Sequence, residues 1–175
     1  YASAERIFEV LDEKTEVVDS GENDLMQLES ELQFENVSFD YGEGSFQLID
    51  INFKMGKGET VAVVGASGAG KSTIADLIPR FYDVSKGKII IDGKDIREYK
   101  IHSLRKMMGI VTQETILLNS SIRDNITYGS NEIDEKKMLE AANSANASEF
   151  IDNLEFQYDT IIGERGVKLS GGQQQ

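Results

Sequence analysis

A glycine-rich run that ends in lysine and two hydroxyl residues constrains the fold more than any other stretch of this sequence. Residues 65–73 read Gly-Ala-Ser-Gly-Ala-Gly-Lys-Ser-Thr, which fits the pattern G-x-x-x-x-G-K-[ST]. A short β-branched apolar segment, Thr60–Val64, precedes the run. The segment Lys71–Leu77 has helical character, and Pro79 would stop that helix. The pattern therefore predicts a buried strand, a tight loop and a helix in succession, as in α/β proteins with a parallel sheet.

The predicted loop has the composition of a phosphate-binding site. Its glycines allow the backbone to turn with its N–H groups pointing inward, and the following helix adds the positive end of its dipole. We expect the ammonium of Lys71 to reach the outer phosphates and the hydroxyl of Ser72 to bind Mg²⁺. The predicted phosphate contacts are Gly65, Ala66, Ser67, Gly68, Ala69, Gly70, Lys71, Ser72 and Thr73. An accidental glycine-rich turn and a dinucleotide-binding turn are the alternatives, although the latter uses the spacing G-x-G-x-x-G.

Such a phosphate site has to be local, because the chain as a whole is acidic. The sequence contains 31 acidic and 18 basic residues, for a formal net charge of −13. A field of this sign repels polyanions and argues against a nucleic-acid-binding surface. No apolar run approaches the roughly 20 residues that span a bilayer, and the N-terminus lacks the features of a signal peptide, so we expect a soluble chain. The absence of cysteine excludes disulfides and cysteine-based metal sites.

The sequence before the loop predicts a linker and antiparallel strands. Ala2–Asp12 has the spacing of a short amphipathic helix, and the acidic stretch Glu13–Glu31 is typical of an exposed connection. Strands are expected near residues 32–39 and over Phe46–Phe53, before a turn at residues 56–58. Alternation gives the first strand two faces, one with Leu32, Phe34 and Asn36 and the other with Val37 and Phe39.

The sequence after the loop predicts two more strands and then helices. Ile89–Ile91 is followed by Asp92-Gly93, a pair that favours a hairpin, and Met107–Val111 has the composition of a buried strand. From Ser121 to Leu154 the residues favour helix. We expect the packing faces of these helices to contain Leu139, Ala142, Ala145 and Phe150.

A second motif, Leu169-Ser-Gly-Gly-Gln173, lies roughly 100 residues after the first. Ser170, Gly171 and Gly172 would open another helix and offer more N–H donors to a phosphate. A flexible Gly-Gly turn is the alternative. With both motifs, the sequence from about Ala2 to Gln175 resembles the ABC ATPase family, whose signature is LSGGQ.

The resemblance implies an α/β fold and a domain organisation. The expected architecture is a P-loop NTPase core with a small antiparallel β-subdomain and a helical subdomain at about residues 115–173. Residues 1–30 would be the end of a connecting helix and a linker, and residues 31–175 a partial nucleotide-binding domain.

The resemblance also implies ligands, roles and partners. In this family the signature of one subunit closes over the MgATP held by the phosphate loop of its partner. Ser170, Gly171, Gly172 and Gln173 would therefore bind ATP in a head-to-tail dimer of two nucleotide-binding domains. Lys71, Gln113 and Ser170 would act in catalysis, since Gln113 in Val-Thr-Gln-Glu matches the Q-loop glutamine that contacts Mg²⁺ and the membrane domain. Tyr41 in Phe-Asp-Tyr-Gly matches the aromatic residue that stacks on adenine.

Gln113 and Tyr41 each have a simpler interpretation. Gln113 could be an ordinary loop residue, and Tyr41 a half-buried aromatic residue of a strand.

Three segments resemble bacterial multidrug and lipid exporters in particular. Gly163–Gly166 is similar to the X-loop that touches the membrane domain of exporters, and an ordinary charged turn is the alternative. Ala2–Asp12 looks like the connection from the last membrane span, and Ile116–Ile126 matches their sequence after the Q-loop. These features imply the ATPase domain of an exporter on the cytoplasmic face of the cell membrane. An ABC-type DNA-repair ATPase is the alternative, and it fits the acidic charge poorly.

The sequence departs from the family pattern in two places. The Asp and catalytic Glu of the Walker B strand, and the switch His, follow the signature in the family, whereas this sequence ends two residues after it. We therefore expect the 175 residues to bind nucleotide weakly or not at all and without turnover, and the phosphate-loop strand to lack a neighbour. Neither His102 nor Glu114 is expected to replace the missing groups. Gln174 stands where exporters often carry a basic residue, and this change is expected to be tolerated.

Overall fold

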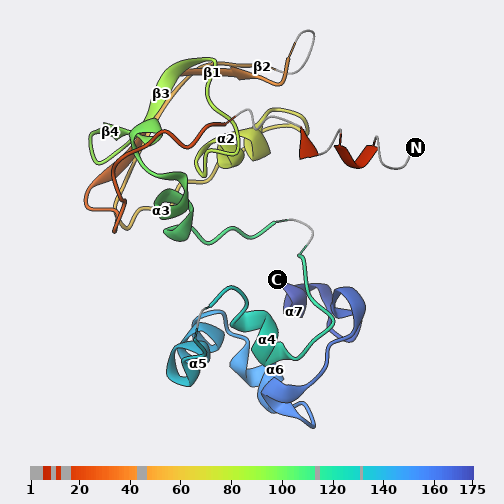
Figure 1. Ribbon diagram of the computed structural model, residues 1–175. Coiled ribbons are helices and arrows are strands. Elements are labelled where there is room, and N and C mark those ends of the chain that lie inside the picture. Colours follow the sequence, from red (N-terminus) through yellow and green to blue (C-terminus); the bar gives the residue numbers. More distant parts are fainter. Residues whose placement is uncertain (1–5, 9–10, 13–16, 43–46, 113–114, 131) are drawn as a thin grey trace. The chain divides into compact units, whose positions relative to one another are not determined.

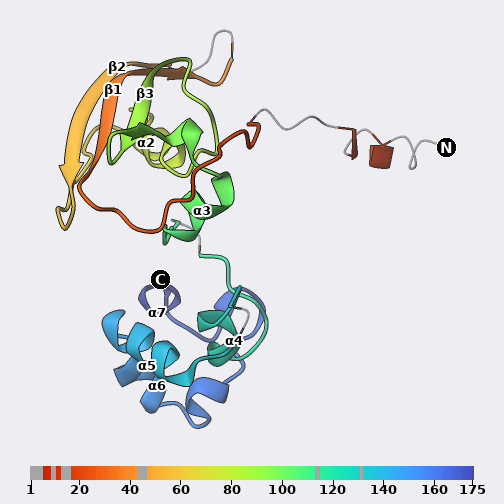
Figure 2. The ribbon, with the colours of Figure 1, turned by 60° about the vertical axis from the view of Figure 1, so that its left-hand side comes forward.

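The computed structural model describes residues 6–8, 11–12, 17–42, 47–112, 115–130 and 132–175. The chain divides into two units, Tyr1–Gly109 and Ile110–Gln175. Figure 1 labels the elements of both units, and Figure 2 shows them from another side. In the segment Ala2–Asp12, residues 6–8 and 11 are helical, and the side chains of Ile7, Phe8 and Leu11 are exposed.

The first unit contains an antiparallel sheet with the strand order β2-β1-β3-β4. The strands are β1 (Glu31–Asp40), β2 (Gln47–Gly56), β3 (Lys86–Ile91) and β4 (Lys94–Asp95). The predicted hairpin is confirmed, because Asp92 and Gly93 connect β3 to β4 with φ values of 50° and 81°. Positive φ at both positions is the geometry of a type I′ turn, which accounts for this residue pair.

The predicted faces of β1 are wrong, because a bulge at Asn36 changes the alternation. Leu32 and Phe34 are buried before the bulge and Val37 and Phe39 after it, so all four belong to the same core. The pairing with β2 and β3 shifts register at this point, and Asn36 has a φ of 49°. A bulge inserts one unpaired residue and exchanges the faces of everything that follows.

Two helices cover the apolar face of this sheet, α2 (Lys71–Leu77) and α3 (Ile101–Lys106). The bounds of α2 agree with those predicted from the sequence, and Pro79 follows its end. Leu77 of α2 and Leu104 of α3 are fully buried against the strands. The shared core also contains Leu25, Leu48, Ile89, Ile91, Tyr99 and Ile96, the last from the 3₁₀ helix η1 (Ile96–Glu98). Burial of apolar area thus fixes α2 to the sheet.

Two predicted strands are not formed. Thr60–Val64 contains no regular strand and is exposed throughout, with Val64 at 88% exposure. Met107–Val111 also lacks a strand, and Val111 is 74% exposed. A strand needs a neighbour for its hydrogen bonds, and the described residues place none beside either segment. Both segments have the apolar composition of a buried parallel strand. In the structure, however, most of their residues are exposed.

The segment before β1 is more closely bound to the first unit than predicted. The exposed connection was expected to extend over Glu13–Glu31, yet Leu25 belongs to the core. Asn23 forms a parallel bridge with Tyr99, and the backbone N–H groups of Glu22 and Asn23 both donate to the carbonyl of Glu98. Gly21 is required at its position, because a Cβ would lie 2.1 Å from the carbonyl oxygen of Tyr99.

The second unit is helical, as expected for the region Ser121–Leu154. Its elements are α4 (Ile122–Ile126), α5 (Glu135–Ser144), α6 (Ser148–Asp152), the 3₁₀ helices η2 (Gln157–Asp159) and η3 (Glu164–Gly166), and α7 (Gly171–Gln174). Their core consists of Ile122, Ala142, Ile151 and Ile162, with Phe150 packed against it. Leu139 and Ala145 are exposed instead of packed, whereas Met138 is buried. No helix in the described parts of the chain is long and apolar enough to cross a membrane.

The Asp92 carboxylate gives the sheet a testable pH dependence. Burial alone would raise the pKa of Asp92, but hydrogen bonds from the N–H groups of Glu29, Ser30 and Glu31 lower this pKa below its ordinary value of 3.8. The ionised group therefore stabilises the fold fully above pH 3.8, and this contribution is lost as the pH falls through the lowered folded-state pKa.

We expect Asp92→Asn, which tolerates the same positive φ, to reduce the free energy of unfolding at pH 7 by about 1 kcal/mol. Denaturant titrations at several pH values measure this difference, which should shrink in acid. Asp50→Asn is the control, since Asp50 has a similar φ of 53° but is exposed. An equal effect of both substitutions at every pH would contradict the assignment.

Candidate functional site

The glycine-rich loop before α2 is exposed to solvent. Gly68 and Gly70 have φ values of 78° and 88°, and Gly70 is the N-cap of α2. Such φ values strain any residue with a Cβ, so glycine is needed here for backbone conformation. A Cβ on Gly68 would meet nothing within 4 Å, so open space surrounds the turn. A ligand group beside Gly68 would therefore not meet a neighbouring side chain at that position.

The ammonium group of Lys71 lies over the loop. Its Nζ donates to the carbonyl oxygens of Gly65 at 3.0 Å and Ala66 at 2.8 Å. Phosphate oxygens are charged and form stronger hydrogen bonds to ammonium than carbonyl oxygens do. The same group can therefore turn from the loop to a phosphate at short range. Ser72 is exposed in the first turn of α2, where its hydroxyl is available to a metal ion or a phosphate.

Tyr41, the predicted adenine-stacking residue, lies beside this first turn of α2. Its hydroxyl is 3.1 Å from the hydroxyl of Thr73, so Thr73, which is buried, holds the ring near the phosphate loop. The residue as a whole is 48% exposed. Edge contacts with Phe39 at 4.8 Å and Tyr82 at 5.1 Å between ring centroids form an aromatic cluster. Tyr82 was missed from the sequence, where nothing but its aromatic character could have indicated it.

A pocket of about 310 Å³ opens beside Tyr41. It is lined by Val17, Phe39, Asp40, Tyr41, Tyr82 and Asp83. An aromatic wall next to a phosphate-binding loop is suited to a ligand with a flat ring at one end and phosphates at the other.

The signature motif forms the start of α7 in the second unit. The Ser170 hydroxyl accepts a hydrogen bond from the Gln173 N–H, and the Gln173 side chain accepts one from the Ser170 N–H. This reciprocal capping box fixes the helix start. Ser170, Gly171 and Gly172 are exposed, and the Ser170 N–H is the one already bonded to Gln173. The motif thus offers a second set of N–H groups suited to an anion.

Gln174 connects α7 to the preceding segment Gly163–Gly166. Its side-chain amide donates to the carbonyls of Gly166 at 2.9 Å, Arg165 at 3.3 Å and Leu169 at 3.4 Å. Gly166 has a φ of 66°, and a Cβ there would lie 2.5 Å from the side chain of Leu117. The glutamine at position 174 is therefore more than tolerated, because its amide holds three carbonyls in place.

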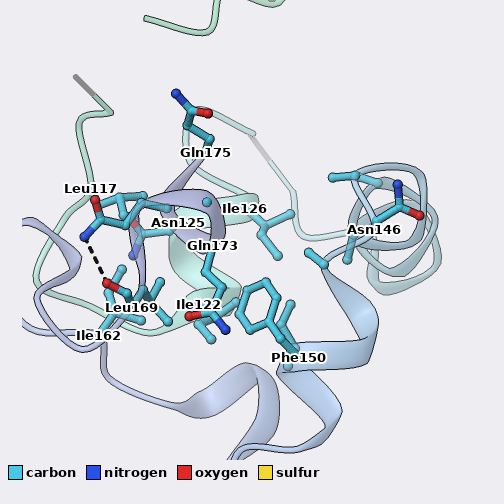
Figure 3. A pocket seen from close by; sticks show the side chains of 17 residues that line it. Leu117, Ile122, Asn125, Ile126, Asn146, Phe150, Ile162, Leu169, Gln173 and Gln175 are labelled. Atoms are coloured by element: carbon cyan, nitrogen blue, oxygen red, sulfur yellow. Dashed lines mark hydrogen bonds between the residues drawn. The ribbon is translucent and has the colours of Figure 1, made fainter. Parts of the chain in front are cut away.

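An apolar pocket of about 470 Å³ adjoins α7, and Figure 3 shows its lining. Ile122, Ile126, Phe150 and Ile162 supply apolar walls, and Gln173 of α7 and Gln175 after it also line the pocket. The pocket lies within the second unit and contains no charged lining residue.

Three further residues were singled out in the sequence, Gln113, Glu114 and His102. Gln113 and Glu114 lie outside the described residues, so the role of the Q-loop glutamine stays a prediction. His102 is exposed on α3, as expected for a surface residue. In the described parts of the chain, no group of three His, Cys, Asp or Glu side chains could hold a metal ion.

Comparison with known proteins identifies the family. A family model described as "ABC transporter" matches residues 48–175, which include both motifs. The chain belongs to the ABC transporter family.

Its relatives in this ABC transporter family are longer proteins. The chain is 49% identical to the ATP-dependent lipid A-core flippase of Syntrophus aciditrophicus over 99% of its own length and 29% of that protein. It is 48% identical to a putative multidrug export ATP-binding/permease protein of Bacillus subtilis, with 99% and 30% covered. A solved bacterial Atm1-family ABC exporter with ATP bound matches with a TM-score of 0.88 and 41% identity, over 97% of this chain and 30% of that one. The chain thus spans about 30% of the length of these relatives.

These comparisons confirm the predicted ABC ATPase fold and the similarity to the ATP-binding domains of bacterial exporters. The first unit brings Tyr41 together with the loop Gly65–Thr73, and the second carries Ser170–Gln173. Contact of each residue with ATP remains a prediction.

The role of Gln174 can be tested by replacing its side-chain NH₂ group with an oxygen, which leaves the shape of the side chain almost unchanged. We expect Gln174→Glu to destabilise the second unit by about 1–2 kcal/mol, since a carboxylate would face three carbonyl oxygens. Amide hydrogen exchange at Leu169, whose N–H donates to Gly166, measures the effect locally. Gln175→Glu makes the same change at an exposed position and serves as the control. Equal exchange rates in the two variants would show that the three contacts contribute nothing.

Proposed function

We propose that this chain is the nucleotide-binding part of an ABC exporter and holds MgATP through the loop Gly65–Thr73. The observation that carries the proposal is the exposed glycine-rich turn with the Lys71 ammonium held over it at the start of α2. Main-chain N–H groups and one ammonium can bind a triphosphate although the chain carries a net charge of −13.

Each group has a proposed task. Lys71 and the loop amides bind the β- and γ-phosphates, and the Ser72 hydroxyl, together with Gln113, binds Mg²⁺. The metal, when bound, neutralises charge on the phosphate oxygens. Tyr41 stacks on the adenine, a role supported by its exposed ring beside the first turn of α2. The polar loop would thus bind the phosphates of the nucleotide, and the aromatic surface would bind its base.

The signature motif is proposed to act on the nucleotide of a second copy or of a homologous domain. Its support is the exposed, capped start of α7, which presents Ser170, Gly171 and Gly172 outward. Two such domains in head-to-tail orientation would each complete the site of the other. Binding of ATP between the two domains would then favour the closed pair. Loss of the γ-phosphate would favour separation of the pair.

The proposed partner is a membrane domain of the same transporter, reached through the Q-loop and Gly163–Gly166. The names of the relatives, a lipid A-core flippase and a putative multidrug export protein, support export. By this similarity the nucleotide-binding part lies at the cytoplasmic face of the cell membrane. An ABC-type DNA-repair ATPase is disfavoured by these relatives and by the acidic charge.

Substitution of the loop lysine tests the proposal. We expect Lys71→Ala to weaken binding of ATP with Mg²⁺ at least tenfold, because charge-assisted hydrogen bonds to phosphate are lost. Isothermal titration calorimetry measures the dissociation constant. Lys106→Ala removes an equal charge at an exposed helical position of the same unit and should leave ATP affinity unchanged. Equal affinity in both variants would refute the phosphate site.

Turnover separates nucleotide binding from hydrolysis. We propose that the complete parent protein hydrolyses ATP and that the 175 residues bind it with little turnover. The reason is the resemblance, in which the catalytic carboxylate belongs to a strand that follows the signature. A steady-state phosphate-release assay on both proteins measures the difference. Robust, Lys71-dependent hydrolysis by the 175 residues would contradict this division.

A further inference from the structure

The segment before β1 contributes to the pocket beside Tyr41. Val17, near its start, lines this pocket together with residues from the end of β1 and from the turn after α2. Val17 is partly buried, whereas the side chain of its neighbour Val18 is 63% exposed. The two valines therefore face different surroundings although they are adjacent in the chain.

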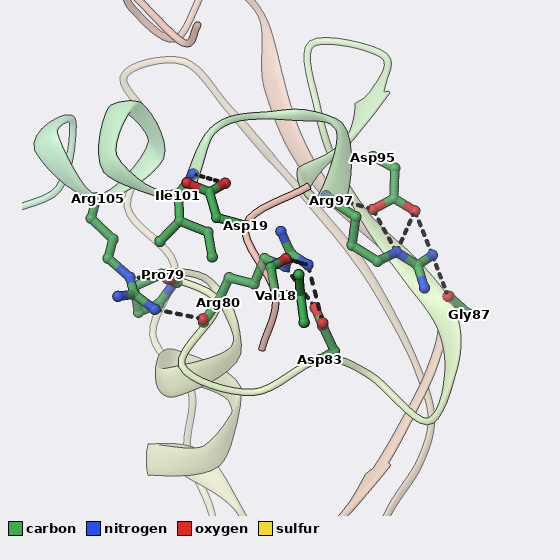
Figure 4. Close-up of polar contacts among 10 residues, drawn as sticks. All are labelled: Val18, Asp19, Pro79, Arg80, Asp83, Gly87, Asp95, Arg97, Ile101 and Arg105. Atoms are coloured by element: carbon green, nitrogen blue, oxygen red, sulfur yellow. Dashed lines mark hydrogen bonds and ion pairs between the residues drawn. The ribbon is translucent and has the colours of Figure 1, made fainter. Parts of the chain in front are cut away.

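A buried arginine holds this segment in place. Arg80, in the turn after α2, is 3% exposed, and its guanidinium forms hydrogen bonds of 2.7 and 3.1 Å with the two carboxylate oxygens of Asp83. Its Nη2 also donates to the carbonyl oxygen of Val18 at 3.2 Å. Figure 4 shows the three residues together. A planar guanidinium can bind a carboxylate and a carbonyl at once, which a single ammonium does less well.

The turn that carries Arg80 is itself fixed. Arg105 of α3 donates to the carbonyl oxygens of Pro79 at 2.9 Å and Arg80 at 2.8 Å, and Arg80 has a φ of 55°. The segment has a second attachment, since the Asp19 carboxylate accepts a hydrogen bond from the Ile101 N–H at 2.9 Å. Contacts at the Val18 carbonyl and at Asp19 thus anchor the chain directly after Val17 and restrict where Val17 can lie.

Asp83 joins the two roles. It is paired with Arg80, and it also lines the pocket together with Val17 and Tyr41. The buried guanidinium balances the charge of Asp83, which reduces its repulsion of an anionic ligand nearby. The same ion pair therefore holds the wall of the pocket and offsets the charge of Asp83, one of the two carboxylates in the lining.

We propose that Val17 forms an apolar wall of the base subsite opposite the aromatic cluster, and that Arg80 is the positioning residue that holds it there. The inference rests on the proposed function, since it assigns the pocket to the base of the nucleotide bound at the phosphate loop. Tyr41 connects the two regions through its contact with Thr73 in the first turn of α2. The segment that precedes the sheet is thereby part of the nucleotide site.

A comparison of two ligands tests this wall. Calorimetry with ATP and with inorganic tripolyphosphate, both with Mg²⁺, separates contacts to the base from contacts to the phosphates. We expect Val17→Ala to weaken ATP binding about three- to tenfold and to leave tripolyphosphate binding unchanged. Val18→Ala is the matched control, and it should alter neither affinity because that side chain is exposed.

Arg80→Lys tests the positioning role. A lysine keeps the buried charge near Asp83 but lacks a second nitrogen for the Val18 carbonyl. We expect the same selective loss of ATP affinity as for Val17→Ala. The ratio of ATP to tripolyphosphate affinity is the informative quantity, because partial unfolding reduces the binding of both ligands equally. A merely structural role of Arg80 would leave this ratio unchanged and would overturn its positioning role.

The outcomes distinguish this inference from the proposed function. If the unsubstituted protein bound neither ATP nor tripolyphosphate, the proposed function and the base wall would both be refuted. If it bound both ligands in a Lys71-dependent manner but Val17→Ala and Val18→Ala had equal ATP affinities, the proposed function would stand and the base wall would be refuted.

Discussion

The packing of α2 against the antiparallel sheet is the interaction on which the first unit depends. Leu77 is fully buried among the residues of β1 and β3, and Ile74 and Ile78 pack against the same core. This apolar contact fixes both ends of a seven-residue helix. The N-terminal end carries Lys71 and the phosphate loop, and the turn after the C-terminal end carries Arg80. Burial of one short helix therefore determines where two different polar groups act.

Backbone N–H groups allow a chain with an acidic net charge to bind an anionic ligand. A basic surface patch would have to overcome a net charge of −13 over long distances, whereas N–H groups and one lysine act only at close range. Solvent ions screen the distant carboxylates, but they screen contacts within the loop much less. Local backbone geometry can thus favour an anionic ligand even where the overall charge of the chain opposes it.

The sequence best predicted the features that depend on interactions between residues close together in the chain. The bounds of α2 and the hairpin at Asp92-Gly93 follow from local residue preferences, and the structure confirms them. The faces of β1 were not predictable from alternation, because the bulge at Asn36 arises from pairing with two other strands. Thr60–Val64 shows the complementary limit: an apolar composition indicates a buried strand, but a strand forms only where a partner is present.

The site shows the same division between local pattern and tertiary contact. Gly65–Thr73 and Ser170–Gln173 are recognisable because their chemistry requires consecutive residues, whereas Arg80 and Gln174 act through contacts that no spacing reveals. Both residues use side-chain N–H groups to hold backbone carbonyls, Arg80 that of Val18 and Gln174 those before α7. Carbonyl groups held in this way fix the backbone of their segments. The neighbouring residues can then present an apolar wall or free N–H donors to a ligand, since their own conformation no longer has to be fixed by that ligand.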